Sequence, residues 1–78
     1  MNTVVVINGN GGWGKGSSLA QAFKNCPYKK GKPICIARAY NCDESEVTVD
    51  DNGAVHSPGT SSMIYLGRFT GTITEVKQ

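Results

Sequence analysis

The glycine-rich segment from Gly9 to Ser18 carries residue types that could bind phosphate. A nucleotide-binding P-loop has the pattern G-x-x-x-x-G-K-[ST] between a strand and a helix, and Gly9, Gly14 and Lys15 match it. Gly16 stands where the pattern requires a hydroxyl, so the usual magnesium ligand is missing. An active NTPase also needs several parallel strands, for which 78 residues leave no room. The segment could still bind a small phosphate-bearing ligand. The residues around the phosphate would be Gly12, Gly14, Lys15 and Ser17.

Residues for enzyme catalysis are sparse. His56 is the sole histidine, and no spacing in the sequence places it as a base against a nucleophile. Cys26, Cys35 and Cys42 are odd in number and lack the C-x-x-C spacing of zinc ribbons and redox sites. We therefore predict no enzyme, no catalytic residue, no metal site and no cofactor, and we expect the cysteines to be small core residues.

The charges are divided between the two halves of the chain. Residues 1–42 contain six Lys and Arg and no acid, whereas residues 43–78 contain six acids and two bases, giving +6 and −4. A basic face attracts phosphates or acidic proteins, and an acidic face attracts basic partners. Self-complementary, solvated surfaces are the alternative.

The binding candidates fall into two sets according to this division. The basic set combines aromatic and cationic residues, the types that dominate binding hot spots and that track nucleic-acid backbones. Its members are Trp13, Lys15, Tyr28, Lys29 and Lys30. The acidic set is represented by Glu46 and Asp50. Trp13 lies among glycines, so its indole either covers the small core or forms an exposed anchor, and the sequence leaves both open.

The first half of the chain must position the glycine segment. The β-branched run Val4 to Ile7 predicts a strand buried on both faces, followed by a glycine loop. Ser17 or Ser18 offers an N-cap, with Gln21 in capping-box position relative to Ser18. Apolar residues then recur at helical spacing and predict a helix packed on a sheet: Leu19, Ala22, Phe23 and Cys26.

The second half alternates with a period of two. From Ile34 to Tyr40 the larger residues alternate with Cys35, Ala37 and Ala39, which we expect to face the helix closely. Residues 46–50 form the next strand, and Asn52-Gly53 predicts a two-residue type I′ hairpin returning through Val55. Further strands are predicted for residues 63–66 and 68–76.

These elements predict one α+β domain over residues 1–78. A single helix packs on a small antiparallel or mixed sheet of four to five strands, in the order β-α-β-β-β. The second face of this sheet has no helix, so it either stays polar or pairs with a second copy, which makes a homodimer one expectation. No signal peptide or membrane-spanning run is present, and we expect the protein in the cytoplasm with no membrane partner.

A resemblance to a known group rests on two short patterns. The segment Trp13 to Ser18, with Ala20, Ala22 and Asn25 after it, resembles small bacteriophage proteins with a W-G-[RK]-G-x-[ST] loop. A second pattern of that group, V-x-V-D-x-x-G-x-V, is close to residues 47–55. The resemblance implies a phage accessory protein in the host cytoplasm, a class that includes anti-CRISPR and other anti-defence proteins, and it assigns no functional residue.

The function expected from the sequence is non-enzymatic binding. The resemblance implies stoichiometric inhibition of a host defence protein complex. The charges of the chain leave either the basic or the acidic set as its contact surface. A binder that sequesters a phosphate-bearing nucleotide and a nucleic-acid-binding module are the alternatives. An apolar interface on the open sheet face is what remains if neither charged set makes the contact.

Overall fold

The computed structural model describes residues 2–9, 11–27 and 34–69. Strands β1 (Thr3–Asn8) and β2 (Trp13–Gly16) precede helix α1 (Leu19–Asn25), and strand β3 (Cys35–Tyr40) follows it. The short 3-10 helix η1 (Glu44–Glu46) then leads to strands β4 (Thr48–Val49), β5 (Val55–His56) and β6 (Met63–Phe69). The fold is α+β, as the sequence predicts.

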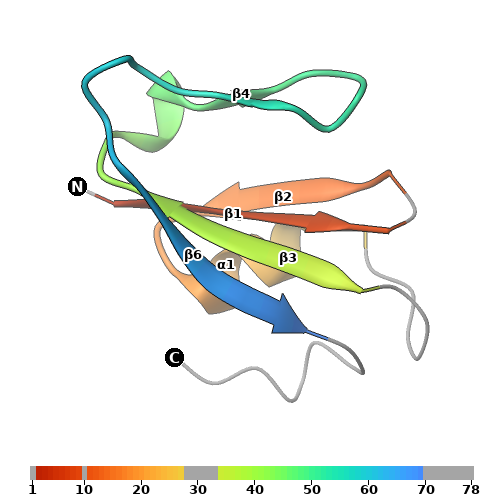
Figure 1. Cartoon of the computed structure of the whole chain (residues 1–78). Coiled ribbons are helices and arrows are strands. Elements are labelled where there is room, and N and C mark those ends of the chain that lie inside the picture. The colour runs from red at the N-terminus through yellow and green to blue at the C-terminus, as the bar shows by residue number, and fades with distance from the viewer. Residues whose placement is uncertain (1, 10, 28–33, 70–78) are drawn as a thin grey trace.

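Within the described residues the main sheet is antiparallel and has four strands in the order β2-β1-β3-β6. Helix α1 covers one face of this sheet, and the two-stranded β4–β5 ribbon lies over the other face (Figure 1). Strand β1 is therefore buried on both faces, which explains its run of β-branched residues: Val4 and Val6 belong to the helix-side core, and Val5 belongs to the ribbon-side core.

The helix-side core is formed as the apolar spacing predicts. Ala22, Phe23 and Cys26 are buried against Cys35 and Ala37 of β3, and Leu19 and Ala39 pack at the edge of this cluster. Ser18 is the N-cap, and its hydroxyl accepts a hydrogen bond from the backbone N–H of Gln21. Small side chains on β3 thus allow the helix to approach the sheet closely.

The ribbon-side core is smaller. Val5, Tyr40, Cys42 and Val47 are buried in it, and Ile7, Val49 and Val55 pack against it. Among the described residues the three cysteines are free thiols inside these two cores, as expected. The sequence leaves the second face either to stay polar or to pair with a second copy, but on its β1 and β2 side the β4–β5 ribbon of the same chain packs against it.

The predicted element order needs two corrections. The sequence predicts a loop for residues 13–16, but they form strand β2, which pairs with β1 in the register Val4↔Gly16 to Ile7↔Trp13. The order is therefore β-β-α-β at the start of the chain. The β4–β5 hairpin, in addition, is a separate sheet rather than part of the main one.

The hairpin exists where Asn-Gly predicts it, but the turn type is different. Val49 pairs with Val55, Gly53 N–H donates to Asp50 O, and Gly53 alone in this turn has a positive φ, of 81°. A type I′ turn would also require a positive φ at Asn52. The Asp50 carboxylate instead accepts hydrogen bonds from the backbone N–H groups of Asn52 and Ala54, which stabilises a longer loop.

The last predicted strands merge into one. Strand β6 runs without a break from Met63 to Phe69, with a register shift opposite Ala37 and Arg38 that leaves Leu66 as the extra residue. Gly67 at this bulge has a φ of 131°. The predicted continuation over residues 70–76 lies outside the described residues.

Candidate functional site

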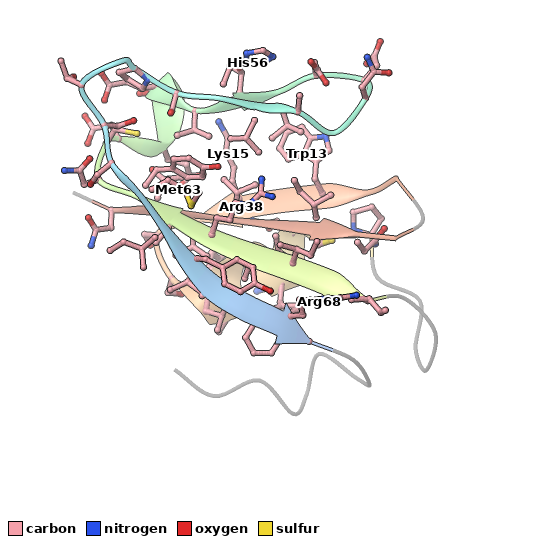
Figure 2. All side chains as sticks on the ribbon, in the orientation of Figure 1. Trp13, Lys15, Arg38, His56, Met63 and Arg68 are labelled. Atoms are coloured by element: carbon pink, nitrogen blue, oxygen red, sulfur yellow. The ribbon has the colours of Figure 1, made fainter. Side chains whose placement is uncertain are left out.

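Strand β2 divides the W-G-K-G segment between the two faces of the sheet. Trp13 and Lys15 point from β2 toward the β4–β5 ribbon (Figure 2), whereas Gly14 and Gly16 are buried on the helix side. The alternation of a strand thus accounts for the alternation of large and small residues in this motif.

The two glycines allow α1 to contact β2 directly. A Cβ atom at Gly14 would lie 2.5 Å from the carbonyl oxygen of Ala22 and 2.5 Å from the carbonyl carbon of Asn25. A Cβ atom at Gly16 would lie 2.7 Å from Cγ of Gln21. Asn25 secures the same contact, because its side-chain amide donates to Lys15 O over 2.8 Å. The glycines are therefore required by helix packing, independently of any ligand.

The turn before β2 is closed by Asn8, whose side chain is buried. Its Oδ1 accepts a hydrogen bond of 3.0 Å from Gly12 N–H, and its Nδ2 donates to Pro27 O beyond the end of α1. The backbone N–H of Asn8 also donates to Gly12 O over 2.9 Å. In a P-loop such amides point at a phosphate, whereas the Gly12 amide here is already bonded within the protein.

Lys15 is bonded to the backbone of the segment that leads into the ribbon. Its Nζ donates to Glu44 O and to Val47 O, each over 2.7 Å. These carbonyls lie in and just after the short helix η1, where a cation complements the carbonyl groups at a helix end. The same ammonium group would have to leave both carbonyls to bind a phosphate, so this geometry does not favour a phosphate loop.

The remaining members of the basic set lie in different environments. Trp13 is half-buried beside Ile7, its cross-strand partner, so it is neither a fully buried lid nor a fully exposed anchor. Ser17, from the predicted phosphate loop, is exposed just before the N-cap. Tyr28, Lys29 and Lys30 lie outside the described residues.

The acidic set lies on η1 and the ribbon, where both of its members have structural partners. Glu46 Oε2 accepts the backbone N–H of Asp43 over 3.0 Å, which closes the start of η1. Asp50 Oδ2 lies 3.0 Å from His56 Nε2 across the hairpin. The hydrogen bond from His56 and those from Ala54 and Asn52 lower the pKa of Asp50.

Three more carboxylates extend this acidic layer, and all of them are exposed. Asp43 is the N-cap residue of η1. Within the described part of the chain, the carboxylates of Glu44 and Asp51 make no hydrogen bond or ion pair. Residues 43–67 contain no Lys or Arg. The structure therefore brings five carboxylates onto one projecting layer, and Glu44 and Asp51 are its two members without a structural role through their side chains.

Cys26 and Cys35 lie in environments that suppress their reactivity. Burial, with a smaller contribution from nearby Cys26, raises the pKa of Cys35 to about 11. Burial also raises the pKa of Cys26, although the Asn8 amide, 3.6 Å from its Sγ, opposes this shift. Both thiols belong to the helix-side core, whereas His56 lies on the outer side of the ribbon (Figure 2). The fold thus separates Cys26 and Cys35 from the imidazole with which either thiol could have paired.

The ribbon leaves the β3 and β6 side of the sheet open. Residues on this open half of the ribbon-side face alternate along the two strands: Ile36, Arg38, Met63, Tyr65 and Arg68. Arg38 and Tyr65 are cross-strand partners, as are Ile36 and Arg68. Neither guanidinium has an ion pair or hydrogen bond within the described part of the chain.

The sequence carries only a partial signal for this open half. The two-residue period from Ile34 places Arg38 on the face of Ile36 and Tyr40, and that signal is sufficient for β3. The same reasoning cannot place Arg68, because the bulge at Leu66 reverses the side of every residue after it.

Neither a metal centre nor a membrane-spanning helix is present in the described residues. No group of three or more His, Cys, Asp and Glu side chains in residues 2–9, 11–27 and 34–69 is arranged to hold a metal ion. No helix among the same residues has the length and apolar character needed to cross a membrane.

Comparison of the chain with protein-family models, with curated proteins and with solved structures finds no match. Function is therefore inferred from the fold and from the placement of the side chains.

Proposed function

We propose that this protein is a non-enzymatic binding protein that inhibits a host protein complex by stoichiometric contact through its acidic layer. The observation that carries the proposal is the exposure of Asp43, Glu44, Glu46, Asp50 and Asp51 on η1 and the ribbon, in a stretch without Lys or Arg. Such a surface complements a basic partner, including a protein groove that ordinarily holds nucleic-acid phosphates.

The contacts of the two charged sets favour the acidic one. Lys15 is held by two carbonyl groups and Trp13 is half-buried below the ribbon, so neither is free to dock without rearrangement. The carboxylates, in contrast, are held in place by the capping bond to Glu46 and by the Asp50 turn. The phage resemblance supplies the class of target, a host defence complex.

Charge reversal at Glu44 and Asp51 tests the proposal. The double variant Glu44→Lys/Asp51→Lys is compared with the wild type as bait in a bacterial lysate, at low and high salt. We expect retention of the bound complex to fall by about tenfold or more, and wild-type binding to weaken as salt rises. Glu46 and Asp50 are left unchanged because their substitution would also disturb the fold.

Lys24→Glu is the matched control, because Lys24 is exposed on α1, away from the acidic layer. This variant should retain the complex as the wild type does. Equal retention by Glu44→Lys/Asp51→Lys and the wild type would refute the acidic layer as the contact surface.

A second candidate function, nucleic-acid binding, has one observation in its favour. Arg38, Arg68 and Tyr65 on the open half of the sheet combine cations that have no ion pair among the described residues with an exposed ring. Single-stranded nucleic acid is bound by such combinations. Fluorescence anisotropy with a labelled single-stranded oligonucleotide tests this function, and Arg68→Glu should abolish any salt-sensitive signal.

Nucleotide sequestration stays a prediction. A thermal-shift screen against mono-, di- and cyclic nucleotides is suitable, since a ligand at about a hundredfold over its Kd adds about 2.7 kcal/mol to stability. Ser17→Ala is a better control than Lys15→Ala, because loss of the Lys15 hydrogen bonds would by itself lower the unfolding temperature.

A further inference from the structure

Strand β6 is an edge strand with exposed apolar residues. It pairs with β3 on one side, and no described residue pairs with its other side. Met63, Ile64, Tyr65 and Leu66 are between 39% and 62% exposed, which makes them, with Ile34, the large exposed apolar residues of the described chain. Exposed apolar residues concentrated on one edge indicate an interface.

The two faces of β6 are both apolar. Met63 and Tyr65 point to the ribbon side of the sheet, whereas Ile64 points to the helix side. A solvated face of an antiparallel sheet is normally polar, and apolar residues on both faces are typical of a strand that is covered on both faces. The composition of β6 is thus that of a strand whose exposed side chains are covered by a partner.

The outer backbone of β6 is oriented to bond to another strand. Asn41 N–H donates to Ser62 O over 3.3 Å, so Asn41 and Ser62 form a hydrogen-bonded pair at the start of the ladder. Because such pairs alternate in an antiparallel ladder, Met63 and Tyr65 direct their N–H and C=O groups away from β3. These groups are the ones that an added strand would meet.

We propose that β6 pairs in antiparallel orientation with β6 of a second copy of this chain, forming one continuous eight-stranded sheet across a two-fold axis. This proposal concerns a different surface from the acidic layer, and its outcome is independent of the proposed function. A two-fold interface requires a self-complementary surface, and the register of β6 provides one.

The register that pairs Tyr65 with Arg68 of the second copy keeps the paired side chains on the same side of the sheet. Beyond the bulge, Arg68 lies on the ribbon side and Phe69 on the helix side, as their pairs with Ile36 and Cys35 show. Pairing Tyr65 with the Arg68 position of the second copy then places Ile64 opposite the Phe69 position, with the axis between Leu66 and Gly67. Each of these contacts occurs twice by symmetry.

The pairs formed in this register are complementary in chemistry. The Arg68 guanidinium has no ion-pair partner among the described residues, and a tyrosine ring is a favourable partner for it. Ile64, the most exposed of the apolar residues, would be covered by an aromatic ring across the strands. A second copy would thus give the Arg68 guanidinium a partner and would cover the exposed Ile64 side chain.

The apolar composition of β6 favours a second copy over nucleic acid as the occupant of this edge. Nucleic acid is bound chiefly through phosphate contacts of cationic side chains, whereas β6 has one base and four exposed apolar residues. Strand β6 contains no acid, so a copy of it brings no carboxylate into the strand pairing itself.

Analytical ultracentrifugation of the full chain over a range of concentrations tests the proposal. The wild type should sediment as a monomer–dimer equilibrium, and Ile64→Lys should raise the dimer Kd by about tenfold or more, since it buries a charge in the new sheet. Ile34→Lys is the matched control: Ile34 is exposed and apolar but precedes β3, so its Kd should stay within about twofold of the wild type.

A double-mutant cycle tests the register itself. Tyr65→Ala and Arg68→Ala should each weaken the dimer, their effects should be non-additive, and Tyr65→Phe should bind like the wild type because the ring is retained. These substitutions are exposed, so they also decide the question if Ile64→Lys fails to fold.

Hydrogen exchange at the Tyr65 amide distinguishes pairing with a second copy from cover by the chain itself and from a bare edge. In the dimer this amide should be protected, and Ile64→Lys should remove the protection. A protein that stays monomeric at every concentration overturns the proposal. In that case, slow hydrogen exchange at the Tyr65 amide would indicate that the chain itself covers the edge, and fast exchange would indicate a bare edge. A dimer that is unaffected by Ile64→Lys and by the Tyr65 and Arg68 variants overturns it as well.

Discussion

At the scale of single residues, Lys15 joins the main sheet to the ribbon layer. Its two hydrogen bonds to Glu44 O and Val47 O cross between β2 and the segment around η1. Hydrogen bonds that involve a charged group contribute more than neutral ones, and a carbonyl left without a partner near buried Val47 would cost additional free energy.

We predict that Lys15→Ala lowers the free energy of unfolding by about 2 kcal/mol, measured by urea denaturation. Lys24→Ala, at an exposed position on α1, should leave it within about 0.5 kcal/mol. Equal stability of the two variants would show that the Lys15 hydrogen bonds contribute nothing in solution.

Asp50 gives a prediction on pH dependence. Its pKa is lowered from 3.8 in the folded protein, chiefly by the His56 side chain and then by the Ala54 amide. A lowered pKa means that the folded state favours the carboxylate, so this stabilisation is complete well above pH 3.8 and is lost as the pH falls through the folded pKa.

Nuclear magnetic resonance of the Asp50 carboxyl carbon measures this shift. His56→Gln should move the pKa of Asp50 upward, toward its ordinary value, whereas Asp51→Asn should leave it unchanged. The difference in urea midpoint between the wild type and Asp50→Asn should shrink between about pH 5 and about pH 2. A difference that grows on acidification would contradict the assigned sign.

At the scale of elements, β2 exists because glycine allows the helix to lie on it. A methyl group at Gly14 would overlap the backbone of α1 at Ala22 and Asn25, and backbone cannot move aside as a flexible side chain can. The W-G-K-G motif therefore describes a strand with one face for the ribbon and one bare face for the helix.

We predict that Gly14→Ala lowers the free energy of unfolding by about 3 kcal/mol, measured by chemical denaturation, because β2 and α1 must separate. Gly59→Ala is the control, since its Cβ would meet nothing within 4 Å and its φ is not in the left-handed region. A Gly14→Ala protein as stable as the wild type would mean that α1 and β2 are not in direct backbone contact.

At the scale of the whole molecule, the two cores share strand β1. Val6 is fully buried on the helix side and Val5 on the ribbon side, so separation of either layer exposes this strand. A shared central strand couples the layers, and we expect the molecule to unfold as one cooperative unit.

The single tryptophan provides a measurement of this coupling. Trp13 fluorescence reports on the region below the ribbon, and far-ultraviolet circular dichroism reports on the sheet and helix as a whole. The two signals should give coincident urea transitions. A fluorescence transition at lower urea would show that the ribbon separates first.

The elements that depend on local pattern are readable from the amino-acid sequence. The β-branched run predicts β1, the spacing of Leu19 to Cys26 predicts α1 with its Ser18 cap, and the alternation after Ile34 predicts β3 with its small face toward the helix. Asn-Gly locates the hairpin. These features depend on periods of 2 and 3.6 residues and on turn chemistry, both of which are present in a single stretch of chain.

The remaining features depend on contacts between distant segments. Whether Lys15 meets a phosphate or a carbonyl depends on η1, which is 29 residues away in sequence. The role of Gly14 depends on the backbone of α1, and the side on which Arg68 lies depends on a bulge opposite β3. Local sequence carries no information on which distant groups will fill the space beside a residue, so the tertiary structure was needed to place them.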